Sequence, residues 1–201
     1  MSDRYDINQN EGELLPNKLG LTDQDAINEE DAAGFLRAEQ AAIDALSADT
    51  VFSLRYLYNL HQAALGHLYE FAGRLRTVNM SKGGFIFPAG GFLPQTMEAF
   101  SHKHLDPLNA SEWNDSVLLL RHLAAMHAEL LYLHPFREGN GRIVRLFTRL
   151  IFLAKVGEEL DFELITKGDN FQRYVTAVQY AAREDYSLME GLFSESHPRL
   201  D

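Results

Sequence analysis

Cysteine is absent from the 201-residue chain. That absence excludes disulfide bonds, thiolate nucleophiles and metal sites built on cysteine. Basic residues are few, because 18 Lys and Arg stand against 29 Asp and Glu and give a formal net charge of −11. Nucleic acids and anionic membranes are bound mainly through Lys and Arg, so we expect neither as a partner. A small phosphorylated ligand needs only a few local donors and stays open.

Long apolar runs are also missing. The longest strongly apolar run, Leu150 to Ala154, is far shorter than the ~18 residues of a membrane-spanning helix. Residues 1–15 contain no apolar segment typical of a secretory signal. We therefore expect a soluble protein of the reducing cytoplasm. One domain is expected, since domains commonly have ~100–200 residues.

Hydrophobic spacing predicts a mainly α fold with a polar lead-in over residues 1–24, a domain over 25–195 and a tail over 196–201. Residues 75–88 interrupt the helical pattern, because β-branched and aromatic side chains there flank a Gly-Gly turn typical of a β-hairpin. A lone hairpin is marginal in water, so it should pack on the helices and leave an edge free for another chain. The expected helices cover 27–46, 53–71, 93–105, 116–133, 141–156 and 170–183.

The segment HPFREGNGRIVR, residues 134–145, contains the most informative pattern. Gly139, Asn140 and Gly141 stand just before a run with helical periodicity. Glycines beside a helix start let backbone N–H groups converge on an anion, which the helix dipole also favours. The Asn140 side chain can add a further donor.

Charged residues flank this glycine segment. Arg142 and Arg145 are three residues apart and therefore neighbours on one helix face, where paired guanidiniums suit a di- or triphosphate. Glu138 would be repelled by phosphates unless a cation intervenes, so it is a candidate Mg²⁺ ligand. A neutral His134 is the best general base within reach of an attacking hydroxyl. Phe136 should point inward and anchor the loop.

Each of these features has a commoner, purely structural explanation. A His-Pro pair usually forms a turn, a Gly-Asn-Gly stretch usually starts a helix, and arginines spaced i and i+3 are usually solvated. The combination is different, because packing alone does not require the whole set within one short segment.

The string resembles the motif of the Fic family, H-x-F-x-D/E-G-N-G-R-x-x-R, at every defined position. The related Doc pattern has Ala-Asn-Lys in place of Gly-Asn-Gly, so Doc-type kinase activity is not the expected chemistry. Residues 61–76 also resemble the family's helix and its aromatic-Ala-Gly-x-x-Arg turn, and residues 77–87 resemble its flap hairpin. The resemblance covers most of residues 25–190. The matching motif positions are His134, Phe136, Glu138, Gly139, Asn140, Gly141, Arg142 and Arg145.

The resemblance implies a single Fic-type helical domain with a small β-hairpin flap, with the active-site loop and helix over 134–156. It implies a protein adenylyltransferase that moves AMP from ATP, with Mg²⁺, to a Tyr, Thr or Ser hydroxyl of a target protein and releases pyrophosphate. His134 would be the base and Glu138, where most relatives have Asp, the metal ligand. Gly139, Asn140 and Gly141 would form the anion hole, and Arg142 and Arg145 would contact phosphates. The target-docking flap would comprise Lys82, Gly83, Gly84, Phe85, Ile86 and Phe87.

Regulation is where the chain departs from the family pattern. Many Fic proteins are inhibited by a helix with S/T-x-x-x-E-G/N, whose Glu pairs with the second motif Arg. Glu precedes Gly at Glu11, Glu138 and Glu190, yet no Ser or Thr stands four positions earlier. Either a small separate antitoxin supplies the inhibitory helix, or Glu11 or Glu190 serves in a degenerate motif. Auto-AMPylation is a further outcome compatible with the family.

Two other functions are compatible with the same residues. A nucleotide-binding module that engages a partner protein with weak or no transfer remains an alternative, as does a deAMPylase. No GxxxxGK[ST], GxSxG or HExxH occurs, which leaves Walker-type NTPases, serine hydrolases and zinc proteases unsupported. His61 is expected to be a satisfied core group. Core packing is also the commoner role for Tyr174, Tyr180 and Tyr186, although each could border an adenine pocket.

Overall fold

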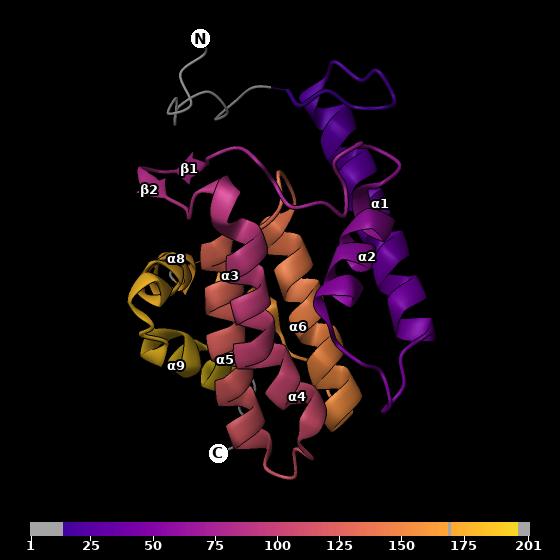
Figure 1. The fold of residues 1–201 in the computed structure, drawn as a ribbon. Coiled ribbons are helices and arrows are strands. Elements are labelled where there is room, and N and C mark those ends of the chain that lie inside the picture. Colours follow the sequence, from indigo (N-terminus) through magenta and orange to yellow (C-terminus); the bar gives the residue numbers. More distant parts are fainter. Residues whose placement is uncertain (1–13, 169, 197–201) are drawn as a thin grey trace.

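The computed structural model describes residues 14–168 and 170–196. The prediction of a mainly α fold with one small hairpin is confirmed (Figure 1). A two-stranded antiparallel sheet joins β1 (Ser81–Lys82) to β2 (Phe85–Ile86). The helices are α1 (Gln24–Asp44), α2 (Leu54–Leu65), α3 (Leu93–Phe100), α4 (Asp106–Ala110), α5 (Ser116–Leu133), α6 (Asn140–Val156), α7 (Phe162–Thr166), α8 (Asn170–Tyr180) and α9 (Ser187–Ser196).

Helices α5 and α6 form the centre of the fold. The α1–α2 pair packs on α6 from one side, and α3, α8 and α9 pack against α5 (Figure 1). Within the described ranges, α5 is the one helix long and apolar enough to cross a membrane by length and composition. Most of its apolar residues, such as Leu123 and Leu130, are buried against neighbouring helices, which accounts for that composition, whereas Val117 and Leu118 are exposed.

Side-chain caps set several helix starts. Asp23 accepts a hydrogen bond from the backbone N–H of Ala26, so α1 begins at Gln24, earlier than the period alone predicts. Asp115 accepts from the first backbone N–H groups of α5, and that helix has the bounds predicted for it. Such caps satisfy donors that have no partner inside the helix.

The helix predicted over 53–71 is wrong over residues 66–71. Helix α2 ends at Leu65, and the chain then turns through residues 66–73. The side chain of His61 accepts a hydrogen bond from the backbone N–H of Gly73, which fixes this turn against the helix. Helical spacing of apolar residues continued past Leu65 because these residues are buried in the turn as well.

Three other local predictions need correction. The hairpin predicted over 75–88 contains paired strands only over 81–86, with Gly83 and Gly84 both at positive φ. The helix predicted over 93–105 ends as α-helix at Phe100 and continues as a π-helical turn, Ser101–Leu105, into α4. Helices α7 and α9 were not predicted, because α7 is only five residues long and α9 contains a central glycine.

Candidate active site

A cavity of about 650 Å³ opens between the flap, the end of α5 and the start of α6. Seven motif residues were predicted as base, metal ligand, anion hole or phosphate contact, and all seven line the cavity. Of the six predicted flap residues, Lys82 and Phe87 line it. Gly83, Gly84, Phe85 and Ile86 are not part of its wall. The lining residues are Met80, Ser81, Lys82, Phe87, His134, Arg137, Glu138, Gly139, Asn140, Gly141, Arg142 and Arg145.

His134 terminates α5, and its backbone is left-handed with φ 48°. Its ring stacks on Phe87 of the flap, with 3.9 Å between ring centroids and 16° between the planes. Nδ1 lies 3.4 Å from the carbonyl oxygen of Leu131. A carbonyl only accepts, so the proton belongs on Nδ1 and Nε2 keeps its lone pair. The imidazole is therefore held as a proton acceptor.

The electrostatic surroundings favour the neutral form of His134. Burial, together with the nearby charges of Arg76 and Lys82, lowers its pKa to about 4 against the opposing hydrogen bond to Leu131. The side chain is thus deprotonated at neutral pH without any preceding step. A bound polyphosphate would bring negative charge and raise this pKa again, as an opposite charge does for any imidazole.

The loop between α5 and α6 is closed by its own side chains. Asn140 is 3% exposed, its Oδ1 accepts from the Phe136 N–H at 2.9 Å, and its Nδ2 donates to the Phe136 carbonyl at 2.7 Å. The side-chain donor expected for an anion is engaged within the loop instead. Phe136 is fully buried, as predicted.

His61 of α2 fixes the same loop from the interior of the protein. Its Nδ1 accepts from the Gly73 N–H at 2.8 Å, so its Nε2 carries the proton and donates to the Glu138 carbonyl at 3.0 Å. The ring stacks on Phe136 at 3.9 Å between centroids. Burial lowers the pKa of His61 to about 4, consistent with a neutral, fully bonded group. The core role predicted for His61 is confirmed, and its contacts extend that role to the site.

Gly139 precedes α6 with φ +75°, a region that L side chains rarely adopt. A Cβ at this position would lie 2.9 Å from the Leu65 side chain and 3.3 Å from Phe35. The first backbone N–H groups of α6, from Asn140 onward, have no acceptor inside the helix. They lie at the cavity wall, where the positive end of the helix dipole favours an anion.

Glu138 and Arg142 stand one helical turn apart and contact each other at 3.4 Å. Glu138 Oε1 also accepts from the Gly139 N–H at 2.9 Å. Arg142 additionally pairs with Asp31 of α1, whose Oδ2 it approaches to 2.9 Å through Nη2. Asp31 was missed by the sequence, where nothing marks one acid among the several in α1.

Arg145 lies beside the glycine segment on the cavity wall. A Cβ on Gly141 would be 3.3 Å from its Nη1, so the missing side chain leaves room for the guanidinium over the first turn of α6. The guanidinium of Arg145 acts on the Tyr174 hydroxyl of α8, where its charge lowers the pKa of the phenol against the larger, opposite effect of burial. Tyr174 is otherwise buried, so its predicted core role holds.

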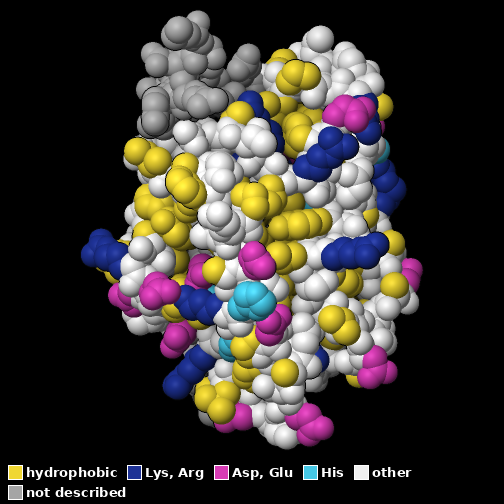
Figure 2. All heavy atoms as spheres, in the orientation of Figure 1, with side chains coloured by type: hydrophobic (Ala, Val, Ile, Leu, Met, Phe, Trp, Pro, Cys, Tyr) yellow, Lys and Arg dark blue, Asp and Glu magenta, His cyan; other side chains and the backbone are white. Residues whose placement is uncertain are grey.

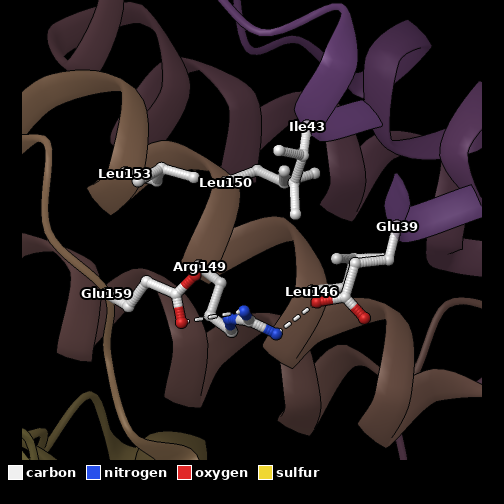
Figure 3. A pocket seen from close by; sticks show the side chains of 7 residues that line it. All are labelled: Glu39, Ile43, Leu146, Arg149, Leu150, Leu153 and Glu159. Carbon is white, nitrogen blue, oxygen red and sulfur yellow. Dashed lines mark hydrogen bonds and ion pairs between the residues drawn. The ribbon is translucent and has the colours of Figure 1, made fainter. Parts of the chain in front are cut away.

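Arg149, which continues the face of Arg142 and Arg145, is used differently. It forms ion pairs with Glu39 of α1 and Glu159, and the three side chains point toward one another in Figure 3. These pairs tie α6 to α1. They also neutralise the charge of Arg149.

Arg76 ends the aromatic-Ala-Gly-x-x-Arg turn that the sequence showed, but its role at the site was not predicted. Its guanidinium donates to four backbone carbonyls, at 2.7 Å to His134, 2.6 Å to Val78, 2.6 Å to Pro88 and 3.3 Å to Leu133. Burial lowers its pKa to about 10, which leaves it charged. Arg76 therefore joins both ends of the flap to the residue that bears the base.

The flap projects from the helical body and carries exposed apolar side chains. Ile86 is 59% exposed, and Phe92, just after the flap, is 67% exposed. Figure 2 shows hydrophobic side chains gathered over the upper part of this face, around the flap, whereas acidic and basic side chains are interspersed over its lower half. Phe85 of β2 packs edge-on against Phe87, which lines the cavity. Ile86, between them in the sequence, is exposed to solvent.

The remaining candidates are clusters of metal-binding side chains and the glutamates considered for an inhibitory helix. Among the described residues, no group of three or more acidic, His or Cys side chains could hold a metal ion. Glu190 lies on α9 and does not line the cavity, whereas Glu11 falls outside the described residues. His127 is fully buried between Thr148 and Tyr174 and is a core group.

Comparison with known proteins bears directly on this site. The model of the Fic/DOC family matches residues 51–152, just over half of the chain, including the whole 134–145 motif. The chain belongs to the Fic/DOC family. Protein adenylyltransferase VbhT of Bartonella schoenbuchensis is 31% identical over 160 residues, covering 77% of this chain and 32% of that protein. A protein adenylyltransferase of Bartonella henselae is 28% identical over 201 residues, covering 90% of this chain and 35% of that protein. The chain spans about a third of the length of these relatives.

Solved structures share the fold of this Fic domain. The N-terminal Fic domain of an effector protein from Bartonella sp. AR 15-3 has a TM-score of 0.78 at 22% identity, covering 92% of this chain and 88% of that one. BepC of Bartonella tribocorum, solved with bound AMPPNP, has a TM-score of 0.71 at 22% identity, covering 90% and 91%. The helical Fic architecture expected from the sequence is thereby confirmed.

Proposed function

We propose that this Fic protein is a Mg²⁺-dependent protein adenylyltransferase. The observation that carries the proposal is one cavity in which a neutral imidazole, the N-terminus of α6 and two motif arginines face the same space. The relatives named protein adenylyltransferase and the AMPPNP held by a structural neighbour support it. A cavity of about 650 Å³ is within the usual size of ligand pockets, ~300–1,000 Å³.

The chemistry follows from the placement of the groups. A target hydroxyl oxygen forms a bond to the α-phosphorus of ATP, the bond from that phosphorus to the bridging oxygen breaks, and pyrophosphate leaves. The hydroxyl proton passes to Nε2 of His134. Arg142, Arg145 and the backbone N–H groups of α6 stabilise the negative charge on the phosphate oxygens.

Glu138 would hold the magnesium ion together with phosphate oxygens. The donor set fits, because Mg²⁺ is commonly bound by one or two carboxylates plus substrate phosphates. The carboxylate of Glu138 contacts Gly139 and Arg142 through Oε1, so Oε2 is the oxygen that would bind a cation. The ion would neutralise phosphate charge beside an otherwise repulsive carboxylate.

The target protein would bind along the flap. The two-stranded sheet has short strands that pair Ser81 with Ile86 and Lys82 with Phe85, so β2 has an edge that faces away from β1. An extended segment of a target could pair with such an edge and present its hydroxyl to His134. The stacking of Phe87 on His134 connects this docking edge to the base.

Inhibition by a separate small protein belongs to the same proposal. In the described part of the chain, Arg142 pairs with Asp31 and Glu138, and Arg145 acts on a tyrosine hydroxyl. No described glutamate from another helix occupies Arg145. Such a carboxylate would come from a partner protein, or from the Glu11 region.

The direct test is incubation of the purified protein with ATP labelled at the α-phosphate, Mg²⁺ and a cell lysate. We expect label on protein, and a loss of about 10²–10⁴-fold in its rate for His134→Ala. His102→Ala is the matched control, because His102 is an exposed histidine remote from the cavity lining. Transfer that survives His134→Ala unchanged would overturn the assigned chemistry.

A further inference from the structure

A buried chain of hydrogen bonds runs between α5, α6 and α8, directly behind the second motif arginine. At its centre is His127 of α5, which has no exposed surface. Its Nδ1 lies 2.9 Å from the hydroxyl of Thr148 on α6, and its Nε2 lies 2.6 Å from the hydroxyl of Tyr174 on α8. The imidazole also stacks on Phe162, with 5.1 Å between ring centroids. Three helices therefore meet at one histidine.

The direction of each bond in this chain is determined. The Thr148 hydroxyl donates its single proton to the Val144 carbonyl at 2.8 Å, so its oxygen must accept from Nδ1–H of His127. Nε2 of the neutral ring is then an acceptor, and the Tyr174 hydroxyl donates to it. The Tyr174 oxygen is left to accept, and the charged group that acts on this hydroxyl is Arg145, which can only donate.

Protonation states agree with this direction. Burial lowers the pKa of His127 well below 6.5 and raises the pKa of Tyr174 to about 12. The ring is therefore neutral and the phenol protonated across the physiological range. With a neutral His127 and a protonated Tyr174, every donor in this chain of hydrogen bonds has one acceptor.

We propose that Tyr174 and His127 are positioning residues that hold the Arg145 guanidinium toward the phosphate-binding cavity. This inference rests on the proposed function, because it takes Arg145 as a phosphate contact. Arg145 lines the cavity from α6, and a long arginine side chain would otherwise sample many rotamers. A guanidinium already fixed by Tyr174 loses less freedom when a polyphosphate binds, which raises affinity.

The first experiment measures binding of AMPPNP with Mg²⁺ by calorimetry, compared with adenosine. Tyr174→Phe removes one hydroxyl, and we expect affinity for AMPPNP to fall about tenfold, the scale of one hydrogen bond to a charged group. Adenosine binding should be unchanged, because adenosine has no phosphate. Tyr180→Phe is the matched control on the same helix, since Tyr180 is 39% exposed and stacks only on Arg183 in the described contacts.

A second variant pair tests the part played by His127. In His127→Gln the side-chain oxygen can replace Nε2 as acceptor for Tyr174, whereas His127→Leu removes the acceptor at similar volume. We expect the glutamine variant to keep most of the AMPPNP affinity and the leucine variant to lose it about tenfold. Thermal unfolding of each variant, measured alongside, separates misfolding from loss of binding.

A spectroscopic measurement tests the direction of the chain independently of binding. Nitrogen-15 spectra of the labelled protein should show His127 as the Nδ1–H tautomer, which is set by Thr148. An Nε2–H tautomer would overturn the proposal. So would Tyr174→Phe binding AMPPNP within twofold of the wild-type protein, or losing AMPPNP and adenosine equally. If AMPPNP binds as expected but no protein becomes labelled, the proposed function fails while the role of Tyr174 stands.

Discussion

Arg142 of α6 donates to Asp31 of α1 across 111 positions of sequence, with 2.9 Å between Nη2 and Oδ2. Asp31 is 3% exposed, and the guanidinium also lies over the ring of Phe35, 4.9 Å from its centroid. The first helix therefore determines where the first motif arginine can go. Burial of this carboxylate opposes its ionisation more strongly than Arg142 favours it, so the pKa of Asp31 is raised above 3.8.

That raised pKa predicts a pH dependence of stability. An acid whose pKa is higher in the folded than in the unfolded state binds its proton more tightly when folded, so the free energy of unfolding falls as pH rises through the folded pKa. We expect the stability of the wild-type protein relative to Asp31→Asn to decrease as pH rises above about 4 in urea unfolding. Asp25→Asn, at an exposed position of α1, serves as the control. A constant difference across this range would contradict the assignment.

His134 predicts a second pH dependence, this time of activity. Because the base is neutral down to its pKa of about 4, kcat/KM for AMP transfer should stay level through neutral pH and fall only as pH approaches 4. Stability behaves with the same sign, since a histidine with a lowered folded pKa loses stabilisation as pH falls below about 6.5. Initial rates with labelled ATP over a pH series are the measurement. If kcat/KM already falls as pH drops through about 6.5, the imidazole of His134 is far more exposed to water than in the structure.

Gly139 predicts a combined loss of stability and nucleotide binding. Gly139→Ala places a Cβ at φ +75° and 2.9 Å from Leu65, whereas Gly84→Ala meets a similar φ of +78° with no atom within 4 Å. Both variants bear the backbone strain, of about 1–2 kcal/mol. Only Gly139→Ala should also weaken AMPPNP binding, because it displaces the α6 N-terminus. Chemical unfolding and calorimetry measure the two effects, and equal losses in both variants would count against the steric argument.

Arg76 predicts a coupling between the flap and the base. Arg76→Met leaves four carbonyl oxygens without their donor, one in a buried and three in part-buried bonds, and each oxygen that water cannot reach costs about 1–3 kcal/mol. We expect a destabilisation of at least about 3 kcal/mol and faster amide hydrogen exchange across residues 78–88. Arg74→Met tests the specificity of this effect, because Arg74 is exposed. Unchanged exchange in the flap of Arg76→Met would mean that the strands are held by other contacts.

The sequence allowed the motif to be placed correctly because its residues are close in the chain. His134, Gly139 and Arg145 lie within one loop and the first turns of one helix, so local rules on glycines, caps and helix faces are enough to bring them together. The bounds of α5 were also predictable, since Asp115 caps its start and Pro135 follows its last turn.

The supporting contacts could not be predicted in this way. Asp31, Arg76 and Tyr174 reach the site from other elements, and only the packing of α1, the flap and α8 decides which charged or hydroxyl side chain becomes buried there. The end of α2 was misjudged for the same reason. The turn that follows it depends on His61 bonding to Gly73, and apolar spacing shows nothing of that bond.

The base and the phosphate site stand at opposite poles of two consecutive helices. His134 terminates α5, where the carbonyl end of the helix carries partial negative charge, and the glycine segment begins α6, where partial positive charge is found. Proton transfer in the proposed reaction creates an imidazolium at the first pole while charge builds on the departing pyrophosphate at the second. The two helix ends that flank the six-residue connection thus supply a fixed electric field of the sign that this charge separation needs, before either substrate arrives.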